Sequence, residues 1–280
     1  MARRAGPSVR SRRLAVTLRK LRRATGLTGA DVAKAVDMSA SKISRVESAD
    51  SGIYLDEVEK LLDFYNVTKQ QRVYLLDLAR HAEQRGLLRI NNTNLPGEDW
   101  QTWADFEEEA NGLLFYEPMM IPGLLQTTEY AASIIQVTGH GLTADEVEAL
   151  VASRMARQGM LHRANPLKLH VIIEQSAVGR RFGGPGAHAR QIRHLLDTAE
   201  LPNVTVQVLP SDVELHAAMT GGFVILEYDE EASLVLLENK VSSLFLDEPE
   251  QIEVFESTWA SLRELALTPA ETVEFLKHLT

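Results

Sequence analysis

The segment from residue 39 to residue 48 carries the side chains whose types and spacing best suit binding to another molecule. If this segment is helical, Ser41 and Arg45 project from the side opposite to Ile43 and Val46, because successive residues turn by about 100°. Serine contacts either type of base, and arginine pairs with guanine through two hydrogen bonds. The exposed face therefore predicts a helix that reads base edges in the major groove of DNA.

Two earlier helices are expected to hold this segment in place. Apolar residues at a spacing of four and three predict a helix from residue 10 to residue 25, which Gly26 ends. Thr28 is a good N-terminal cap for a short second helix, and Ser39 is a good cap for the third. Two helices joined by a short turn, with an exposed polar face on the second, form the helix-turn-helix pattern.

The stretch LRKLRRATGLTGADVAKAVDMSASKISRVES, residues 18–48, resembles the phage-repressor-like (XRE) helix-turn-helix family. With further helices expected at residues 55–65 and 69–81, the resemblance implies a mainly α bundle of five helices. It also implies a structural ion pair between Arg22 and Glu47, which joins the first helix to the third and does not contact DNA.

The same resemblance assigns contacts with DNA. It implies that Ala40, Ser41 and Arg45 read bases, and that Thr28 and Lys42 contact phosphates. Arginines near the N-terminus are expected to add an arm that follows phosphates or enters the minor groove. We therefore expect the DNA-binding residues to be Thr28, Ser39, Ala40, Ser41, Lys42, Ser44, Arg45, Arg10, Arg12 and Arg13.

Charge is distributed unevenly along the chain. Residues 1–90 hold 18 Lys and Arg against 10 Asp and Glu, whereas the remaining residues hold 11 against 29. A polyanion is the expected partner of the basic end, although a solvated basic tail has the same composition. The acidic remainder is expected to repel DNA, which leaves it for a protein, a second copy of the chain or a ligand.

Composition excludes several classes of protein. The chain of 280 residues has no cysteine, which excludes disulfides, thiolate metal sites and cysteine nucleophiles. No apolar run is long enough to cross a bilayer. We therefore expect a cytoplasmic protein with a flexible basic arm over residues 1–9, a helix-turn-helix domain over 10–87, a linker over 88–97 and a second domain over 98–280.

The second domain is expected to be of the α+β class, with a small, largely antiparallel sheet. Residues 167–174 and 204–209 have strand patterns, and residues 222–228 and 233–240 are expected to form a hairpin. Helical patterns flank these strands at residues 143–162, 247–265 and 269–279. Runs of helix around a cluster of strands are typical of this class.

Four segments of this domain resemble the C-terminal domain of a large group of actinobacterial regulators, the WhiJ-like group. They are residues 121–131, 154–158, 178–184 and 206–210. The resemblance implies a role in development and antibiotic production, and a small acidic partner protein. It leaves the biochemical role of the domain itself open.

The residues of the second domain predict no catalytic or metal site. His216 has no partner at the spacing that metal ligands need. Glu174 with Arg180 and Arg181 forms either a salt bridge or part of a pocket for an effector or a partner. We therefore expect no cofactor, no metal and no enzymatic activity.

Together these features predict a sequence-specific transcription regulator that binds double-stranded DNA as a homodimer. The second domain is expected to sense a ligand or a partner protein, or to mediate dimerisation. The alternative is an antitoxin-like protein that silences a small acidic partner and binds DNA only to regulate its own gene. An enzyme with an attached DNA-binding domain would need an activity that depends on Glu174 or His216.

Overall fold

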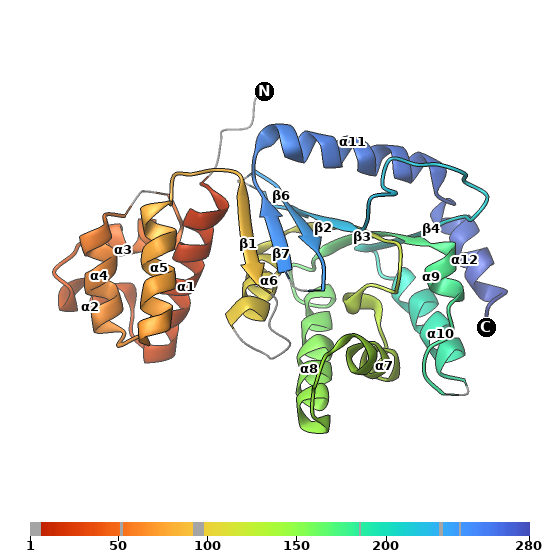
Figure 1. Ribbon diagram of the computed structural model, residues 1–280, viewed down its shortest axis with the longest axis horizontal. Coiled ribbons are helices and arrows are strands. Elements are labelled where there is room, and N and C mark those ends of the chain that lie inside the picture. Colours follow the sequence, from red (N-terminus) through yellow and green to blue (C-terminus); the bar gives the residue numbers. More distant parts are fainter. Residues whose placement is uncertain (1–6, 51–52, 92–97, 185, 230–231, 241) are drawn as a thin grey trace. The chain divides into compact units, whose positions relative to one another are not determined.

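The chain folds into two compact units, one of residues 1–88 with 246–248 and the other of residues 89–245 with 249–280. The structure is a computed structural model that describes residues 7–50, 53–91, 98–184, 186–229, 232–240 and 242–280 (Figure 1). Most of the expected arm, and most of the expected linker, therefore lie outside the described residues. The first residues of that linker are part of a strand.

Five helices make up the described part of the N-terminal unit. They are α1 (Val9–Thr25), α2 (Gly29–Ala35), α3 (Ala40–Glu47), α4 (Leu55–Phe64) and α5 (Lys69–Arg80). The side chains of Thr28 and Ser39 accept hydrogen bonds from backbone N–H groups at the starts of α2 and α3. Gly26 ends α1 with a φ of 72°, a conformation that glycine adopts without strain. These two expected caps and this helix end are confirmed.

The core of the N-terminal unit holds α3 from one side. Leu18 of α1, Ile43 of α3, Leu61 of α4 and Leu75 of α5 are each at most 2% exposed. Burial of one such side chain contributes roughly 1.5 to 3 kcal/mol. Because α3 packs against both α1 and α2, its inner face is fixed and its other face is left to solvent.

A mixed sheet with the strand order β1-β7-β6-β5-β2-β3-β4 forms the centre of the C-terminal region. Its strands are β1 (Leu87–Asn91), β2 (Gly112–Glu117), β3 (Lys168–Glu174), β4 (Val204–Leu209), β5 (Phe223–Glu227), β6 (Leu234–Glu238) and β7 (Ser242–Leu246). The β2–β3 and β3–β4 pairs are parallel, whereas the β2–β5 and β5–β6 pairs are antiparallel. The α+β class and the β5–β6 hairpin are confirmed, but the expected small, largely antiparallel sheet is wrong.

Helical crossovers explain the parallel part of the sheet, because parallel neighbours need a long connection. The chain passes from β2 to β3 through α7 (Thr128–Thr138) and α8 (Ala144–Arg157), with η1 (Gly123–Leu125) and η2 (Gln158–Leu161) beside them. It passes from β3 to β4 through α9 (Gln175–Gly179) and α10 (Ala187–Ala199). The middle of β3 is buried, as expected for a parallel strand that is covered on both faces.

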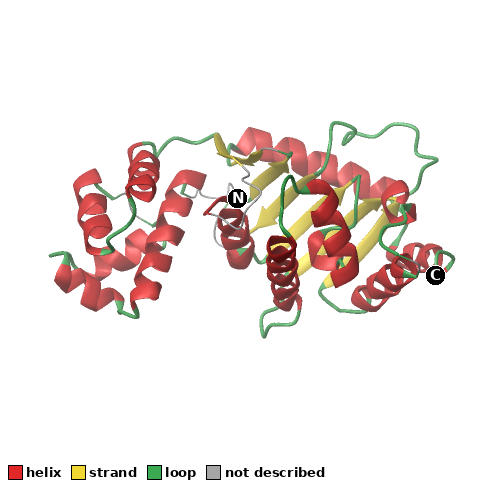
Figure 2. Cartoon of the chain, turned by 60° about the horizontal axis from the view of Figure 1, so that its bottom comes forward, coloured by secondary structure: helices red, strands yellow, loops and turns green. Residues whose placement is uncertain are grey.

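Helices cover both faces of this sheet. Helix α11 (Pro249–Leu265) lies along one face, and α7 and α8 lie on the other (Figures 1 and 2). Helices α10 and α12 (Pro269–Lys277) pack against β4, and α6 (Glu98–Glu109) precedes β2. Within the part of the chain that the structure describes, no helix is both long and apolar enough to cross a membrane.

Candidate nucleic-acid interface and cavity

Helix α3 presents small and cationic side chains to solvent. Its buried residues include Ile43 and Val46, which face the core of the unit. The exposed residues of the helix include four that were expected to contact DNA, namely Ala40, Ser41, Ser44 and Arg45. Nothing bulky stands among these four side chains, so the face can approach the edge of a base closely.

Thr28 and Ser39 lie exposed at the starts of α2 and α3. The Thr28 hydroxyl donates to Asp31 Oδ2 at 2.6 Å, and the same carboxylate oxygen accepts the Thr28 N–H at 2.9 Å. These hydrogen bonds lower the pKa of Asp31, the one from the hydroxyl having the larger effect. The hydroxyl of Ser39 accepts the N–H of Lys42 at 3.1 Å. Both hydroxyls therefore support their own helices.

Two arginines of α1 hold the C-terminal end of α3. Arg22 Nε and Nη2 donate to Glu47 Oε1 and Oε2, each at 2.7 Å, so the pair is bidentate. The hydrogen bond with Glu47 is the main cause of the raised pKa of Arg22. Arg19 donates to the main-chain carbonyl of Glu47 from Nε at 3.2 Å and from Nη2 at 2.6 Å. The structure thus forms the ion pair that the resemblance implied, and Arg19 adds hydrogen bonds to the main chain of Glu47.

A tight turn sets the direction of α3 relative to α2. Asp37 has a φ of 56°, a left-handed conformation that aspartate tolerates better than most residues. The N–H of Met38 donates to the carbonyl of Ala33 at 2.8 Å, which closes the end of α2. The turn is therefore ordered by backbone hydrogen bonding, and α3 starts from a fixed point.

Lys42 points toward α4 and not toward the exposed face of α3. Its Nζ lies 3.0 Å from Glu57 Oε2 and 5.3 Å from the centre of the Tyr54 ring, and its side chain is 18% exposed. The ion pair and the cation–π contact both stabilise this position. The expected phosphate contact of Lys42 stays a prediction, and in this structure the charge of Lys42 serves the packing of α3 against α4.

The three arginines expected to act as part of the basic arm belong to α1. Arg12 and Arg13 are each only 4% exposed, so both side chains pack against other parts of the protein. Arg10 is partly exposed, and its Nη1 donates to the carbonyl of Gln84 at 3.0 Å. The burial of Arg12 and Arg13 argues against their expected DNA contacts, which stay predictions.

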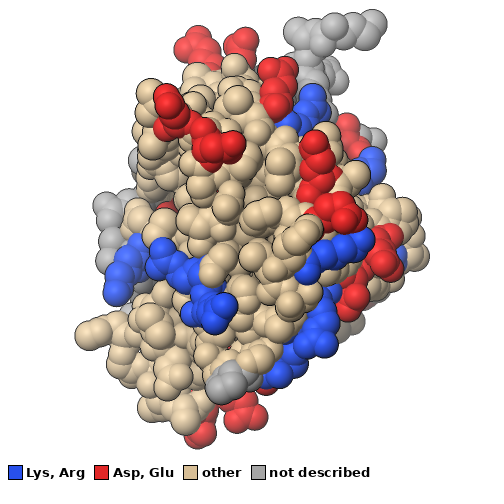
Figure 3. Space-filling model, turned by 90° about the vertical axis from the view of Figure 1, so that its right-hand side faces the viewer, with Lys and Arg blue, Asp and Glu red and all other residues tan. Residues whose placement is uncertain are grey.

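Charges of both signs lie close together on the C-terminal unit. The face on the side of α10 and α12 shows acidic and basic side chains next to one another (Figure 3). One such exposed ion pair joins Arg190 Nε to Glu129 Oε2 at 2.8 Å. The acidic surplus of this part of the chain therefore does not make this face uniformly acidic.

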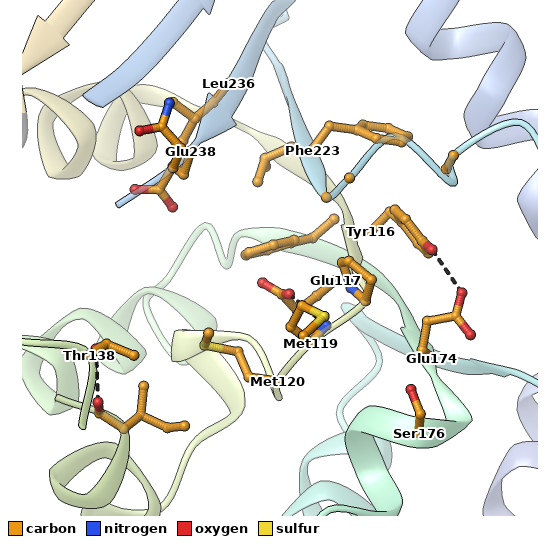
Figure 4. Close-up of a pocket in the computed structure, with 18 of the residues that line it drawn as sticks. Tyr116, Glu117, Met119, Met120, Thr138, Glu174, Ser176, Phe223, Leu236 and Glu238 are labelled. Atoms are coloured by element: carbon orange, nitrogen blue, oxygen red, sulfur yellow. Dashed lines mark hydrogen bonds between the residues drawn. The ribbon is translucent and has the colours of Figure 1, made fainter. Parts of the chain in front are cut away.

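A cavity of about 1120 Å³ opens in the C-terminal unit, between the sheet, helices α7 and α8, and the connection from β4 to β5 (Figure 4). Sites for small molecules usually have a volume of roughly 300 to 1,000 Å³. Much of the wall is apolar, and it includes Trp103, Phe115, Met120, Ile134, Leu150 and Leu236.

Polar groups meet at one end of the cavity. The hydroxyl of Tyr116 donates to Glu174 Oε1 at 2.7 Å (Figure 4). His216 Nε2 lies 3.2 Å from the same oxygen. Burial, followed by the hydrogen bond with Glu174, raises the pKa of Tyr116. Arg180 and Arg181 are exposed and do not line the cavity. The structure therefore keeps Glu174 as a cavity residue and separates it from the two arginines expected to join it.

Two more carboxyl groups, those of Glu117 on β2 and Glu238 on β6, reach into the cavity (Figure 4). Glu117 accepts the N–H of Met119 at 3.0 Å. Burial raises the pKa of Glu117 to about 7, and the charge of Glu238 adds to this rise. Burial also raises the pKa of Glu238. Arg154 donates to Gln126 Oε1 at 2.8 Å, and burial lowers its pKa to about 10.

The cavity was not predicted, because β2 was not among the expected strands. The run GLLFYE at residues 112–117 is a short, mostly apolar segment between Asn111 and Pro118, which is a strand signal. Glu238 is remote from Glu117 along the chain, and only the pairing of strands brings the two together. The site could therefore not be predicted without knowing how the strands pair.

The helix order of the N-terminal unit, the turn before α3 and its exposed face define a DNA-binding helix-turn-helix regulator of the phage-repressor-like (XRE) type. In agreement, residues 13–75 match the family profile of a helix-turn-helix domain. Residues 100–278 match the profile of a domain of unknown function, DUF5753. Because this match covers more than half of the chain, the protein belongs to the DUF5753 family. No curated protein matches the chain.

Proposed function

We propose that the protein is a sequence-specific transcription regulator that places α3 in the major groove of double-stranded DNA. One observation carries the proposal: Ser41 and Arg45 are exposed on a helix whose other side is held by the bidentate Arg22–Glu47 pair. A helix held in this way keeps the same side chains on the same base edges. Fixed geometry of this kind is what direct reading of a sequence requires.

The proposal gives each exposed residue of this surface a role. Arg45 donates two hydrogen bonds to a guanine, and Ser41 contacts a neighbouring base. Ala40 has no polar atom in its side chain and packs against a thymine methyl group. Thr28 and Ser39, at the starts of their helices, lie next to the phosphate backbone, which fixes the register of the protein on the duplex.

The second part of the proposal concerns assembly and control. The regulator acts as a homodimer in the cytoplasm, with two α3 helices about 34 Å apart on successive major grooves. The C-terminal domain senses a ligand or a partner protein, or holds the dimer together, and has no catalytic activity. The resemblance to the WhiJ-like group supports a role in actinobacterial development and antibiotic production.

Selection of bound duplexes from a random pool tests the proposal directly. We expect a palindrome whose half-sites are about 10 base pairs apart, bound at least about a thousandfold more tightly than a scrambled duplex at the same salt concentration. Binding that does not depend on sequence would contradict it. Fluorescence anisotropy with the full chain measures both affinities.

Exposed apolar side chains favour a second candidate function, the binding of a partner protein. Val137 and Leu215 are more than 75% exposed, and Met219 is also exposed. Apolar surface of this kind often marks an interface between proteins. In this candidate, the protein is antitoxin-like and silences a small acidic partner. A co-purified complex that changes the affinity for DNA by more than about tenfold (about 1.4 kcal/mol) would favour it.

A further inference from the structure

The register of three strands places Glu117 and Glu238 in one row across the sheet. Continuing the observed β2–β5 pairing by one residue places Gly222 opposite Glu117. Continuing the β5–β6 pairing by two residues places Gly222 opposite Glu238, so Gly222 lies between the two glutamates. Adjacent strands are about 4.8 Å apart, so the Cα atoms of the two glutamates are separated by roughly 10 Å. Both side chains reach into the cavity (Figure 4).

Gly222 lies close to Pro118 and to the main chain of β2, in the wall of the cavity. A Cβ atom at this position would lie 3.0 Å from Pro118 Cδ and 3.0 Å from the main-chain oxygen of Tyr116. These distances leave almost no room for a side chain without a shift of the backbone. This part of the cavity wall, which Gly222 shares with Glu117 and Glu238, therefore carries no side chain at Gly222.

The charge of the cavity favours a cation. The carboxylates that line it are those of Glu117, Glu174, Glu214 and Glu238, against the cations of Arg154 and Lys240. Among the described residues, neither Glu117 nor Glu238 forms an ion pair within 4.0 Å. Burial raises the pKa of both groups, whereas the charges of Arg157 and Arg154 and a hydrogen bond with Ser243 act to lower that of Glu238. A cation bound between the two groups would favour the ionised form of each.

An anionic ligand fits this cavity less well. Arg154 already donates to Gln126, and Glu238 is close enough to favour its charge. Lys240 is exposed, where water weakens its attraction for an anion. An anion would also face the carboxylates of Glu117 and Glu238 across the cavity.

The walls and the mouth of the cavity are apolar. Phe115 and Leu236 lie in the next row of the sheet, and Met120 and Ile134 also line the cavity. Met119, Val137 and Met219 line the cavity and are themselves exposed. Exposed apolar side chains around a cavity suit the entry of an apolar molecule.

We propose that the cavity binds a small molecule with an apolar body and a cationic amine, whose ammonium group lies over Gly222 between Glu117 and Glu238. The apolar body lies against Phe115, Met120 and Leu236. This assignment rests on the proposed function, in which the C-terminal domain senses a ligand, but binding to the cavity can be measured without DNA.

Isothermal titration of the full chain with three probes of equal length tests the assignment. The probes are octylammonium, 1-octanol and octanoate, which differ only in the charge of the head group. We expect octylammonium to bind at least about tenfold more tightly than octanol, and octanoate to bind most weakly. Equal affinities, a preference for octanoate, or no binding of octylammonium at millimolar concentration would overturn the proposal.

Substitution of each of the two glutamates tests where the ammonium group binds. Glu117→Gln and Glu238→Gln should each lower the affinity for octylammonium about tenfold and leave that for octanol within about twofold. Glu148→Gln, on the exposed part of α8, is the matched control and should change neither affinity. If both cavity variants keep the affinity for octylammonium, the site is wrong. The probe series with the unchanged chain remains a test if either variant fails to fold.

Measuring octylammonium binding and DNA binding on the same chain tests the cavity assignment and the proposed function independently. Octylammonium bound by the chain with no change in affinity for selected DNA would support the cavity assignment and contradict its role in regulation. Selective DNA binding by a chain that does not prefer octylammonium would overturn the cavity assignment and leave the DNA-binding function standing.

Discussion

At the scale of single residues, Glu47 connects the base of α3 to α1 by two kinds of contact. Its carboxylate accepts both hydrogen bonds of Arg22, and its main-chain carbonyl accepts those of Arg19. The carboxylate is largely buried, so it depends on Arg22 for the partner that water would otherwise supply. The orientation of the exposed face therefore depends on these contacts between α1 and α3.

Replacing Arg22 by Ala leaves a largely buried carboxylate without its bidentate partner. We expect the free energy of unfolding of the N-terminal unit to fall by about 3 kcal/mol, measured by urea denaturation. Lys60→Ala, at an exposed position of α4, should change it by less than about 0.5 kcal/mol. An Arg22→Ala protein as stable as the unchanged chain would show that the pair does not hold α3.

The raised pKa of Glu117 predicts how stability depends on pH. Burial raises this pKa to about 7, so between pH 4.5 and about 7 the folded protein keeps a proton that the unfolded chain releases. The free energy of unfolding should therefore fall as pH rises through this interval. Glu117→Gln should remove on the order of 2 to 3 kcal/mol of this fall, measured by urea denaturation from pH 5 to pH 8. Parallel curves for the two proteins would contradict this.

At the scale of elements, the helix-turn-helix was predictable because its signals are local. Thr28, Gly26 and Ser39 set the ends of α1, α2 and α3 through hydrogen bonds and backbone angles within a few residues. The direction of Lys42 was not predictable, because Glu57 lies on another helix. The burial of Arg12 and Arg13 likewise depends on how α1 packs in the folded protein.

The topology of the sheet was only partly predictable. Once β2 is recognised, the order of strands and helices from β2 to β4 alternates, which is typical of a parallel arrangement. The missing strand therefore led to the wrong expectation for the sheet. The cavity depended on the same strand, because Glu117 stands at its end.

The role of Ser39 as the cap of α3 can be measured separately from its proposed contact with DNA. Ser39→Ala removes the hydrogen bond to the N–H of Lys42, and should lower the free energy of unfolding by about 1 kcal/mol. Ser39→Asp keeps a capping oxygen and should restore stability, but its charge should repel phosphates and lower the affinity for DNA. Urea denaturation and anisotropy measure the two effects. A Ser39→Asp protein with full affinity would place Ser39 away from the backbone of DNA.

At the scale of the whole molecule, the basic charge near the N-terminus is only partly available to DNA. Arg12 and Arg13 are buried, and Lys42 contacts Glu57. We therefore expect Lys42→Ala to leave the slope of log affinity against log salt concentration unchanged. Loss of a phosphate contact would reduce that slope by about one. The slope for Lys42→Ala is compared with the slope for Lys34→Ala, a substitution at an exposed position of α2. A reduced slope for Lys42→Ala would show that this lysine leaves Glu57 to bind a phosphate.

In the proposed function, α3 offers Arg45 to the edge of a guanine in the major groove. Methylation of guanine N7 blocks that edge, so interference by methylation on the selected duplex tests it most directly. We predict that methylation of one guanine in each half-site prevents binding by the unchanged chain. Arg45→Ala should lose about 1 to 3 kcal/mol of affinity and become indifferent to methylation at that guanine. Binding that tolerates methylation at every guanine, or an Arg45→Ala protein with the unchanged pattern, would contradict the account.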